Sequence, residues 1–504
     1  MNYKHIPVFG GMLLSPLFAL SQNSKPNIIF IMCDDMGYGD LACYGQKLIR
    51  TPHLDNMARE GMRFTQAYAG SPVSAPSRAS LMTGQHTGHT EVRGNKEYWK
   101  ESARMMYGNN EEFTVVGQHP YAENHILLPE IMKDNGYNTG MFGKWAGGYE
   151  GSVSTPDKRG VDEFYGYICQ FQAHSYYPNF LNRYSKRLGD KEVVRVIMDE
   201  NIKYSMTGNE YFKRPQYASD IIHHKALEWI DSQSADKPFF GLLTYTLPHA
   251  ELVQPQDSIV DEYKSKFIDD RNYKGDNPSR YHAINNTRAQ FAAMITRLDL
   301  YVGEIIEKLK EKGLDKNTLI IFTSDNGPHE EGGADPAFFG RDGVLKGRKR
   351  SCYEGGIRVP FIARWPEKIE ANTVNDHILA FYDVMPTFCD IIGVKNMKKR
   401  YSNKNVEKDY FDGISFAPTM LGNGKQKQHK FLYWEFNETR QLALRMGDWK
   451  MVVKNGKVHL YDLATDIHED NDLAEKYPKV VKKMKKIIHS QHVPSDVFPI
   501  SLPK

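Results

Sequence analysis

Four apolar runs in the chain lead to polar residues. Asn27–Cys33 (NIIFIMC) and residues 318–323 (TLIIFT) are unbroken and rich in β-branched side chains, which is typical of strands buried on both faces. The other two runs are residues 238–245 (PFFGLLTY) and 139–142 (TGMF). Residues 289–312 instead repeat apolar side chains at helical spacing and stop before a glycine. Because strands and helices alternate, we expect an α/β fold with a large, mainly parallel central sheet flanked by helices.

The polar residues after these runs should meet at one edge of the sheet, where ligands of α/β proteins bind. The residues delivered to this edge are Asp34, Asp35, Lys144, His249, Asp325 and Asn326. Taken singly, the Asp-Asp pair and the Asp-Asn-Gly stretch are typical of turns. Both together at one edge favour a metal site, and hard oxygen ligands favour calcium or magnesium over zinc.

The chain changes character beyond about residue 425. The stretches FLYWEF, LALRMGDWKMVVK and VHLYDL alternate in the manner of antiparallel strands. We therefore expect a main domain over residues 25–425 and a small α+β subdomain with an antiparallel sheet over residues 426–504. The Lys-rich residues 479–486 (KVVKKMKK) keep helical spacing, which indicates the solvated face of a C-terminal helix.

Residues 1–21 combine a positively charged start, an apolar run and small residues at a cleavage position, which predicts a secretory signal peptide. No later apolar run is long enough to cross a membrane, so we expect a periplasmic or secreted protein without a membrane partner. The net charge of +3 is too balanced to indicate a nucleic-acid partner. The five cysteines form neither a disulfide framework nor a CxxC zinc motif.

Residues 74–84 (SAPSRASLMTG) resemble the serine-type signature of sulfatases of the alkaline phosphatase superfamily. The resemblance continues, in the family's order, through residues 34–39 (DDMGYG), 142–145 (FGKW), 248–249 (PH), 324–327 (SDNG), 346–349 (KGRK) and 354–360 (EGGIRVP). These independent motifs span about residues 25 to 365, which makes the resemblance specific. It implies an alkaline phosphatase-like fold and a bacterial carbohydrate sulfatase, which is a sulfuric ester hydrolase.

In that family the signature serine is oxidised to formylglycine by a dedicated maturase, and the resemblance assigns this modification to Ser74. The hydrated aldehyde attacks sulfur and later expels sulfate by collapsing back to the aldehyde, a second step that a serine ester lacks. The resemblance also makes Asp34, Asp35, Asp325 and Asn326, completed by Ser74, the ligands of one calcium ion.

Further roles follow from the same resemblance. Arg78, Lys144 and Lys346 are expected to hold the nucleophile and the sulfate oxygens. His249 matches the histidine that protonates the departing sugar oxygen, a role that imidazole suits near neutral pH.

One position departs from the family pattern. The family often has a histidine two residues after the lysine of GKWHLG, but this chain has Ala146 there. Sulfate release then lacks its usual proton acceptor, and His174 is our candidate to replace it.

The substrate is expected from resemblance around residues 165–178, which are similar to bacterial sulfatases of host or dietary glycans. This implies exo-action on galactose or N-acetylgalactosamine sulfated at the 4- or 6-position. Glu435 and His329, with His174, are candidates for contacts to sugar hydroxyls. An aromatic set is expected either to stack on a sugar or to belong to the core, namely Tyr176, Tyr177 and Trp434.

Two alternative functions stay open. Two metals with histidine ligands would favour a phosphatase or phosphonate hydrolase of the same superfamily, using unmodified Ser74 or its aldehyde, whereas this sequence shows ligands for one all-oxygen site. A degenerate sulfatase that only binds sulfated glycans would be consistent with Ala146.

Overall fold

The computed structural model describes residues 25–99, 115–198, 216–275, 281–340, 345–405 and 408–504. The predicted signal peptide, residues 1–21, lies outside these ranges and stays a prediction. Within the described ranges, no helix has both the length and the apolar character needed to cross a membrane.

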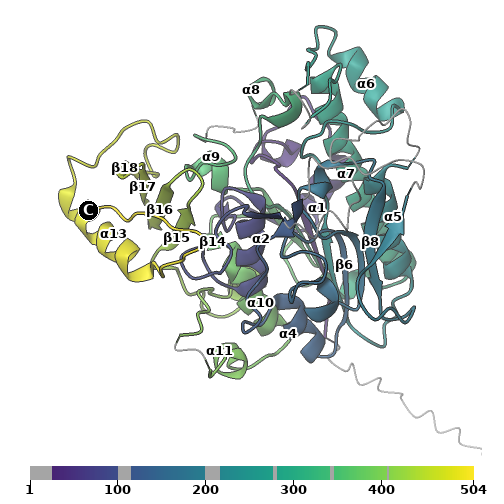
Figure 1. The fold of residues 1–504 in the computed structure, drawn as a ribbon, viewed down its shortest axis with the longest axis horizontal. Coiled ribbons are helices and arrows are strands. Elements are labelled where there is room, and N and C mark those ends of the chain that lie inside the picture. The colour runs from purple at the N-terminus through teal and green to yellow at the C-terminus, as the bar shows by residue number, and fades with distance from the viewer. Residues whose placement is uncertain (1–24, 100–114, 199–215, 276–280, 341–344, 406–407) are drawn as a thin grey trace, which may run out of the picture.

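A large sheet runs through the middle of the main domain (Figure 1). Among the described residues its strands are, in spatial order, β13 (Thr373–Asn375), β2 (Met62–Phe64), β12 (Phe361–Arg364), β11 (Thr318–Ser324), β1 (Asn27–Cys33), β10 (Phe239–Thr244), β6 (Asn138–Lys144), β7 (Glu163–Tyr167), β8 (Phe180–Ser185) and β9 (Val194–Ile197). Strands β11 to β7 are parallel, whereas β12 and β8 pair antiparallel on either side of them. The predicted mainly parallel sheet is confirmed.

Helices cover both faces of this sheet. Successive residues of a strand point to opposite faces, so Ile29 and Ile31 of β1 enter one core and Ile28 and Phe30 enter the other. The first core contains α1 (Pro52–Arg59), α5 (Ala218–Asp231), α6 (Ser258–Lys266) and α7 (Thr287–Glu311). The second contains α2 (Ser74–Thr83), α4 (Leu128–Asp134) and α10 (Val384–Ile391). Burial on both faces explains why β1 has no polar residue between its ends.

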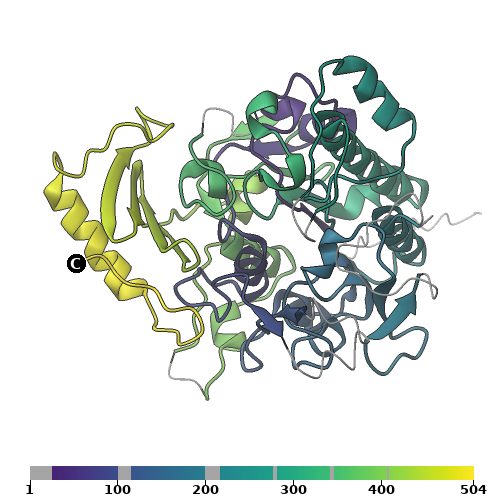
Figure 2. The ribbon, with the colours of Figure 1, turned by 45° about the horizontal axis from the view of Figure 1, so that its top comes forward.

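The C-terminal subdomain has an antiparallel sheet of its own, formed by β15 (Leu432–Phe436), β16 (Gln441–Met446), β17 (Trp449–Lys454) and β18 (Lys457–Asp462). Its inner face packs on the main domain, for example through Trp434 against Tyr68. Its outer face packs on α13 (Pro478–Gln491), which Figure 2 shows on the side away from the main domain. The antiparallel sheet is confirmed, and the predicted boundary at residue 425 falls between α12 (Ala417–Met420) and β15.

The remaining elements are short. Two small ladders pair β3 (Ala67–Tyr68) with β14 (Leu379–Ala380) and β4 (Glu97–Trp99) with β5 (Val115–Gln118). The short helices are α8 (Pro336–Phe339), α9 (Glu354–Ile357), α11 (Met397–Tyr401) and α12 (Ala417–Met420). Single 3₁₀ turns are η1 (Ala42–Tyr44), η2 (Pro156–Lys158), η3 (Gln172–His174), η4 (Asp315–Asn317), η5 (Glu331–Gly333) and η6 (Phe381–Asp383).

Candidate active site

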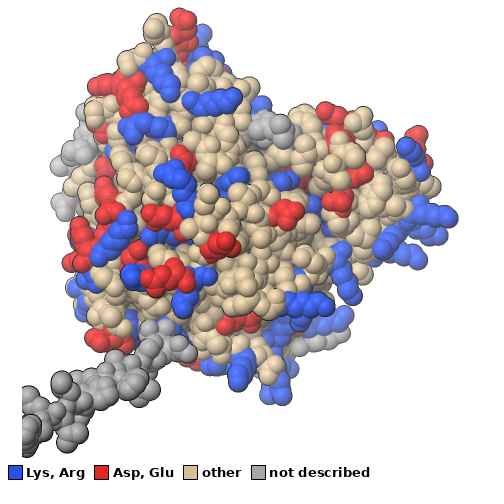
Figure 3. All heavy atoms as spheres, turned by 180° about the vertical axis from the view of Figure 1, so that it is seen from behind, with Lys and Arg blue, Asp and Glu red and all other residues tan. Residues whose placement is uncertain are grey.

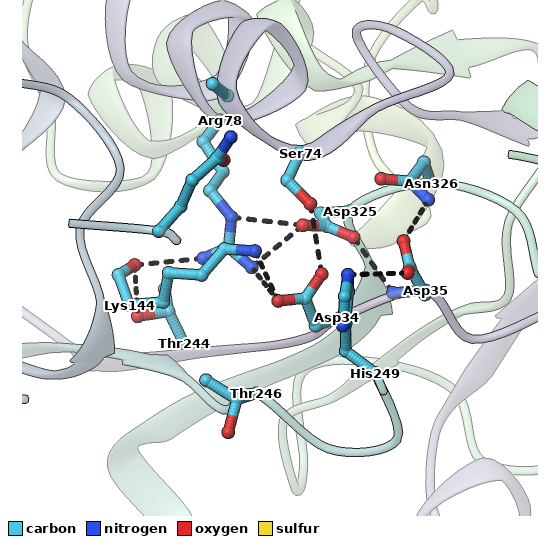
Figure 4. A network of polar contacts seen from close by, with 12 residues as sticks. Asp34, Asp35, Ser74, Arg78, Lys144, Thr244, Thr246, His249, Asp325 and Asn326 are labelled. Carbon is cyan, nitrogen blue, oxygen red and sulfur yellow. Dashed lines mark hydrogen bonds and ion pairs between the residues drawn. The ribbon is translucent and has the colours of Figure 1, made fainter. Parts of the chain in front are cut away.

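The carboxyl ends of four neighbouring parallel strands meet at one edge of the large sheet. Their order is β11, β1, β10 and β6, and β1 ends in register with β11 because Cys33 pairs with Ser324. The residues that follow therefore lie together, and the Asp35 backbone N–H donates to Asp325 Oδ1 at 3.1 Å across 290 residues of sequence. Figure 4 shows the side chains from these strand ends around one centre.

Ser74 is the first residue of α2 and points from this helix towards the strand ends (Figure 4). Its Oγ donates to Asp34 Oδ1 at 3.0 Å, and the residue is 3% exposed. Pro76 stands in the first turn, where the missing N–H costs the helix no hydrogen bond. The amide groups and dipole at this end of α2 favour an anion beside Ser74.

Two buried cations lie next to Ser74. Arg78 donates from Nε and Nη2 to Asp325 Oδ2, at 3.0 and 2.8 Å, and from Nη1 to the Lys144 carbonyl oxygen at 3.0 Å. The Lys144 ammonium contacts Asp34 Oδ2. Burial alone would raise the pKa of Asp34, but the charges of Lys144 and Arg78 outweigh it and hold this pKa below its ordinary value. The two cations thus keep Asp34 ionised, whereas burial and the charge of Asp34 raise the pKa of Asp325 to about 6.

Oxygen atoms of Asp34, Asp35, Asp325 and Asn326 form the centre of the site. Asn326 Nδ2 donates to Asp35 Oδ1 at 2.6 Å. The other amide atom, Asn326 Oδ1, is buried and has no hydrogen-bond partner among the described residues. An unpaired buried oxygen is costly, and a bound cation would satisfy it. Because carboxylate and amide oxygens suit calcium or magnesium, these residues fit the predicted ion.

Lys349 brings a third cationic group to the site. Its Nζ donates to Asp35 Oδ2 at 2.8 Å, to Glu331 Oε2 at 3.1 Å and to His249 Nε2 at 2.8 Å. Arg350 pairs with the other oxygen of Glu331 at 2.5 Å. Burial lowers the pKa of Lys349, but Asp35 and Glu331 outweigh burial and raise it to about 12. Burial and the Lys349 charge lower the pKa of His249, so its imidazole is neutral near pH 7 and its Nε2 accepts.

Lys346 does not lie with these cations, which corrects the predicted site. Its Nζ donates to the Glu469 carbonyl oxygen at 2.7 Å and lies 5.3 Å from the centre of the Tyr353 ring, against the C-terminal subdomain. The reason is local: Gly347 adopts a left-handed conformation with φ of 86° and turns the chain between the two lysines. Lys349 therefore occupies the place that the sequence assigned to Lys346.

A cavity of about 220 Å³ opens beside Ser74. It is lined by Ser74, Asn95, Glu97, Lys144, Gln170, Phe171, His174, His249, Lys349, Arg350 and Glu438. A second, more apolar cavity of about 300 Å³ lies next to Trp229. None of the polar residues that follow β11, β1, β10 and β6 lines it, so it is a weaker candidate for the active site despite its larger volume. The cavity beside Ser74 therefore gives a ligand space next to the cationic cluster, by which we mean Arg78, Lys144 and Lys349.

Of the three residues predicted to contact sugar hydroxyls, only His174 lines this cavity. Its ring stacks on His249 with the ring centres 4.5 Å apart, while Ala146 is buried with its N–H donating to the Ile168 carbonyl oxygen. His329 stacks on His249 with centres 5.4 Å apart, and its Nε2 donates to the Pro248 carbonyl oxygen at 3.1 Å. His329 therefore supports the His249 ring rather than lining the cavity.

Glu435 lies outside the cavity, which corrects a second prediction. Its carboxylate accepts from Arg93, at 3.2 Å, and from Tyr433 and His492, at 2.6 and 2.7 Å. These partners occupy both oxygens and tie β15 to other parts of the fold. The aromatic set also belongs to the core rather than to the cavity, namely Tyr176, Tyr177 and Trp434.

Sequence reasoning missed several residues of the site. Lys349 lies within the quoted KGRK stretch, but only the backbone turn decides which lysine enters the cavity. Glu331 follows β11 by a few residues, and no periodic pattern distinguishes it from other loop acids. Glu97 reaches the cavity wall from the short strand β4 and Glu438 from the turn between β15 and β16, and only the fold reveals the position of either.

The arrangement is suited to an ester of a tetrahedral oxyanion. Positive charge surrounds Ser74, and it would stabilise negative charge in a transition state. It comes from Lys144, Lys349, Arg78 and the N-terminus of α2. His249 stands beside them with a nitrogen that can exchange a proton.

Comparisons with known proteins agree with this chemistry. A family model described as Sulfatase matches residues 26–394, and one described as N-sulphoglucosamine sulphohydrolase, C-terminal, matches residues 347–493. An N-acetylgalactosamine-6-O-sulfatase of Bacteroides thetaiotaomicron is 27% identical over 93% of this chain and 94% of its own. An N-acetylgalactosamine-6-sulfatase of Mus musculus is 30% identical over 86% of this chain and 73% of its own. The crystal structure of Ps i-CgsB in complex with k-i-k-neocarrahexaose superposes with a TM-score of 0.67 at 26% identity, covering 92% of both chains.

Proposed function

Because the chain belongs to the sulfatase family and is a sulfuric ester hydrolase, we propose that it removes sulfate from carbohydrates, with 4- or 6-O-sulfated galactose or N-acetylgalactosamine at a chain end as the substrate. The observation that carries this proposal is the cavity in which Ser74 lies beside Lys144, Lys349 and His249. Its size supports a small sugar end as ligand, and two relatives are named for 6-sulfated N-acetylgalactosamine. The predicted signal peptide supports action in the periplasm or outside the cell.

The proposal includes two groups that act with the chain's own residues. Formylglycine made from Ser74 by a maturase would supply a hydrated aldehyde as nucleophile and an easy way to release sulfate. A calcium ion held by Asp34, Asp35, Asp325 and Asn326 would supply positive charge for the sulfate oxygens.

The chain's residues orient the ester and move the proton. Lys144 and Lys349 bind sulfate oxygens. Arg78 holds Asp325 in place because its Nε and Nη2 both donate to the Asp325 carboxylate. His249 Nδ1 donates to the Ala250 carbonyl oxygen, which leaves Nε2 to carry the proton for the departing sugar oxygen. The lowered pKa of His249 makes its protonated form a better proton donor than an ordinary imidazolium.

The function is tested by comparing defined sulfated sugars with their phosphorylated analogues. We expect release of sulfate from a 4- or 6-sulfated galactose or N-acetylgalactosamine and little release of phosphate. Preference for the phosphorylated analogues would favour a phosphatase, and binding without turnover of any sulfated sugar would favour a degenerate sulfatase. Exclusive action on glucosamine sulfates or on internal positions of a polymer would contradict the proposed substrate.

Removing the metal is expected to abolish activity. Chelation would leave the carboxylates of the centre without the charge that binds sulfate, and calcium added back should restore turnover. Metal analysis should find one calcium ion per chain before chelation. Full activity of a protein shown to be metal-free would exclude this role.

His174→Ala is expected to separate two roles of this histidine. If His174 accepts the proton for sulfate release, kcat should fall by about 10²-fold or more with a burst of released sugar. If it contacts the sugar instead, kcat/KM should fall on the sugar substrate but not on a small aryl sulfate.

His468→Ala is a matched control, because this exposed histidine contacts only Asp470 among the described residues and lies in the C-terminal subdomain. Unchanged kinetics of His174→Ala on both substrates would remove His174 from the site.

A further inference from the structure

The C-terminal helix α13 has a composition unlike the other long helices of the described chain. Its sequence PKVVKKMKKIIHSQ contains five lysines and no acidic residue. The whole protein has 65 basic and 62 acidic residues, so this helix alone carries more positive charge than the net excess of the chain. The rest of the chain is nearly balanced in charge, so the excess of positive charge is concentrated on α13.

Four of these lysines form one continuous face. Lys479, Lys482, Lys483 and Lys486 are spaced by three, four and seven residues, which places them on one side of a helix. All four are exposed, whereas Met484 and Ile488 on the opposite side are buried against the C-terminal sheet. We call these four residues the lysine face. Figure 3 shows blue side chains gathered at the edge of the molecule formed by this subdomain.

The lysine face is not neutralised by neighbours. None of its four members forms an ion pair with another residue in the part of the chain that the structure describes. Surface lysines on other helices behave differently, for example Lys225 with Glu228 at 2.7 Å and Lys310 with Glu307 at 2.9 Å. Asp472, which precedes the helix, pairs with His459 at 2.8 Å instead.

This arrangement is unfavourable for an isolated helix. Like charges three or four residues apart repel each other, and lysines in the first turns oppose the helix dipole. A surface that only had to be solvated would gain from mixed charges. These properties are those of a surface that binds an anion.

We propose that the lysine face binds a sulfated polysaccharide chain, and this choice of ligand rests on the proposed function. Ammonium groups on flexible stems, without a pocket around them, attract a polymer with repeated negative charges rather than one sugar. The face extends over about 10 Å, given the rise of an α-helix, which allows contacts to more than one sulfate. Glu438, in the turn between β15 and β16 of the sheet that carries α13, lines the cavity, so one subdomain contributes both the lysine face and part of the cavity wall.

The test measures binding of full-length protein to immobilised chondroitin 6-sulfate at low ionic strength. A variant with all four lysines of the face replaced by glutamine is expected to bind about tenfold more weakly or worse, and to lose much of the salt dependence of binding. Its kcat/KM should fall on chondroitin chains but stay unchanged on a sulfated monosaccharide. Removing repelling charges should not unfold the helix, which circular dichroism would check.

The matched control removes four lysines that are exposed but dispersed over the main domain, namely Lys47, Lys237, Lys274 and Lys368. This control should bind as the wild type does, because the net charge is the same as in the first variant but the lysine face is intact. Equal loss of binding in both variants, or no loss in the first, would overturn the proposal. Stronger binding to phosphatidylglycerol vesicles than to chondroitin 6-sulfate would overturn it in favour of a lipid surface. A protein that binds chondroitin 6-sulfate through these lysines but hydrolyses no sulfated sugar would contradict the proposed function alone.

Discussion

Replacing Ser74 by alanine is expected to lower kcat by about four to six orders of magnitude, because it removes the nucleophile at the centre of the cationic cluster. The Oγ of Ser74 lies 3.0 Å from Asp34 Oδ1, and no other hydroxyl among the residues lining the cavity can replace it. The measurement is turnover of a sulfated sugar by protein from the native host. In the wild type, mass spectrometry should also show a loss of about two mass units at Ser74, as an alcohol becomes an aldehyde.

Ser71→Ala is the control for this prediction. Ser71 is buried three residues before Ser74, and its Oγ has no hydrogen-bond partner among the described residues. Removing that hydroxyl should therefore leave both activity and stability close to those of the wild type. A Ser74→Ala protein with substantial activity, or full activity of wild type that contains only serine, would contradict the role of Ser74.

Lys349→Ala is expected to lower kcat/KM by about 10²–10³-fold, the usual effect of removing one charge that stabilises an oxyanion. The ammonium of Lys349 contacts Asp35, Glu331 and His249 and lines the cavity. Its loss also leaves Asp35 and Glu331 with an unbalanced buried charge, so the melting temperature should fall as well.

Lys346→Ala provides a matched control three residues away. Lys346 lies against Glu469 and Tyr353 rather than in the cavity, so its removal should change kcat/KM by about twofold at most. The opposite result, a large loss for Lys346 and a small one for Lys349, would show that the sequence motif and not the structure identifies the sulfate-binding lysine.

The sequence predicted the central strands well because burial on both faces leaves a clear pattern. Strand β1 has the predicted ends, and the helix expected at residues 289–312 is found as Thr287–Glu311. Strands β2 and β13, with three residues each, are too short to carry a period of their own and depend on pairing with distant segments.

The site was predictable where residues follow a strand directly, and less so elsewhere. Asp34 and Asp325 gather because β1 and β11 pair in register. For Lys346 and Lys349, however, the outcome depends on the left-handed turn at Gly347, which a motif match does not reveal. Glu435 is a polar residue in β15, and the sequence does not show which way its side chain points. Its partners Arg93 and His492 come from remote segments, and they hold it outside the cavity.

The pairing of β1 with β11 also sets an order of events during synthesis. Asp35 and Asp325 are 290 residues apart, so the metal centre cannot form until the ribosome has passed residue 326. Contacts of such sequence separation form late in folding. Ser74 is made long before that point, and α2 cannot become buried in the finished site during the interval. An enzyme that oxidises Ser74 would therefore find its side chain accessible, before folding closes the site around it.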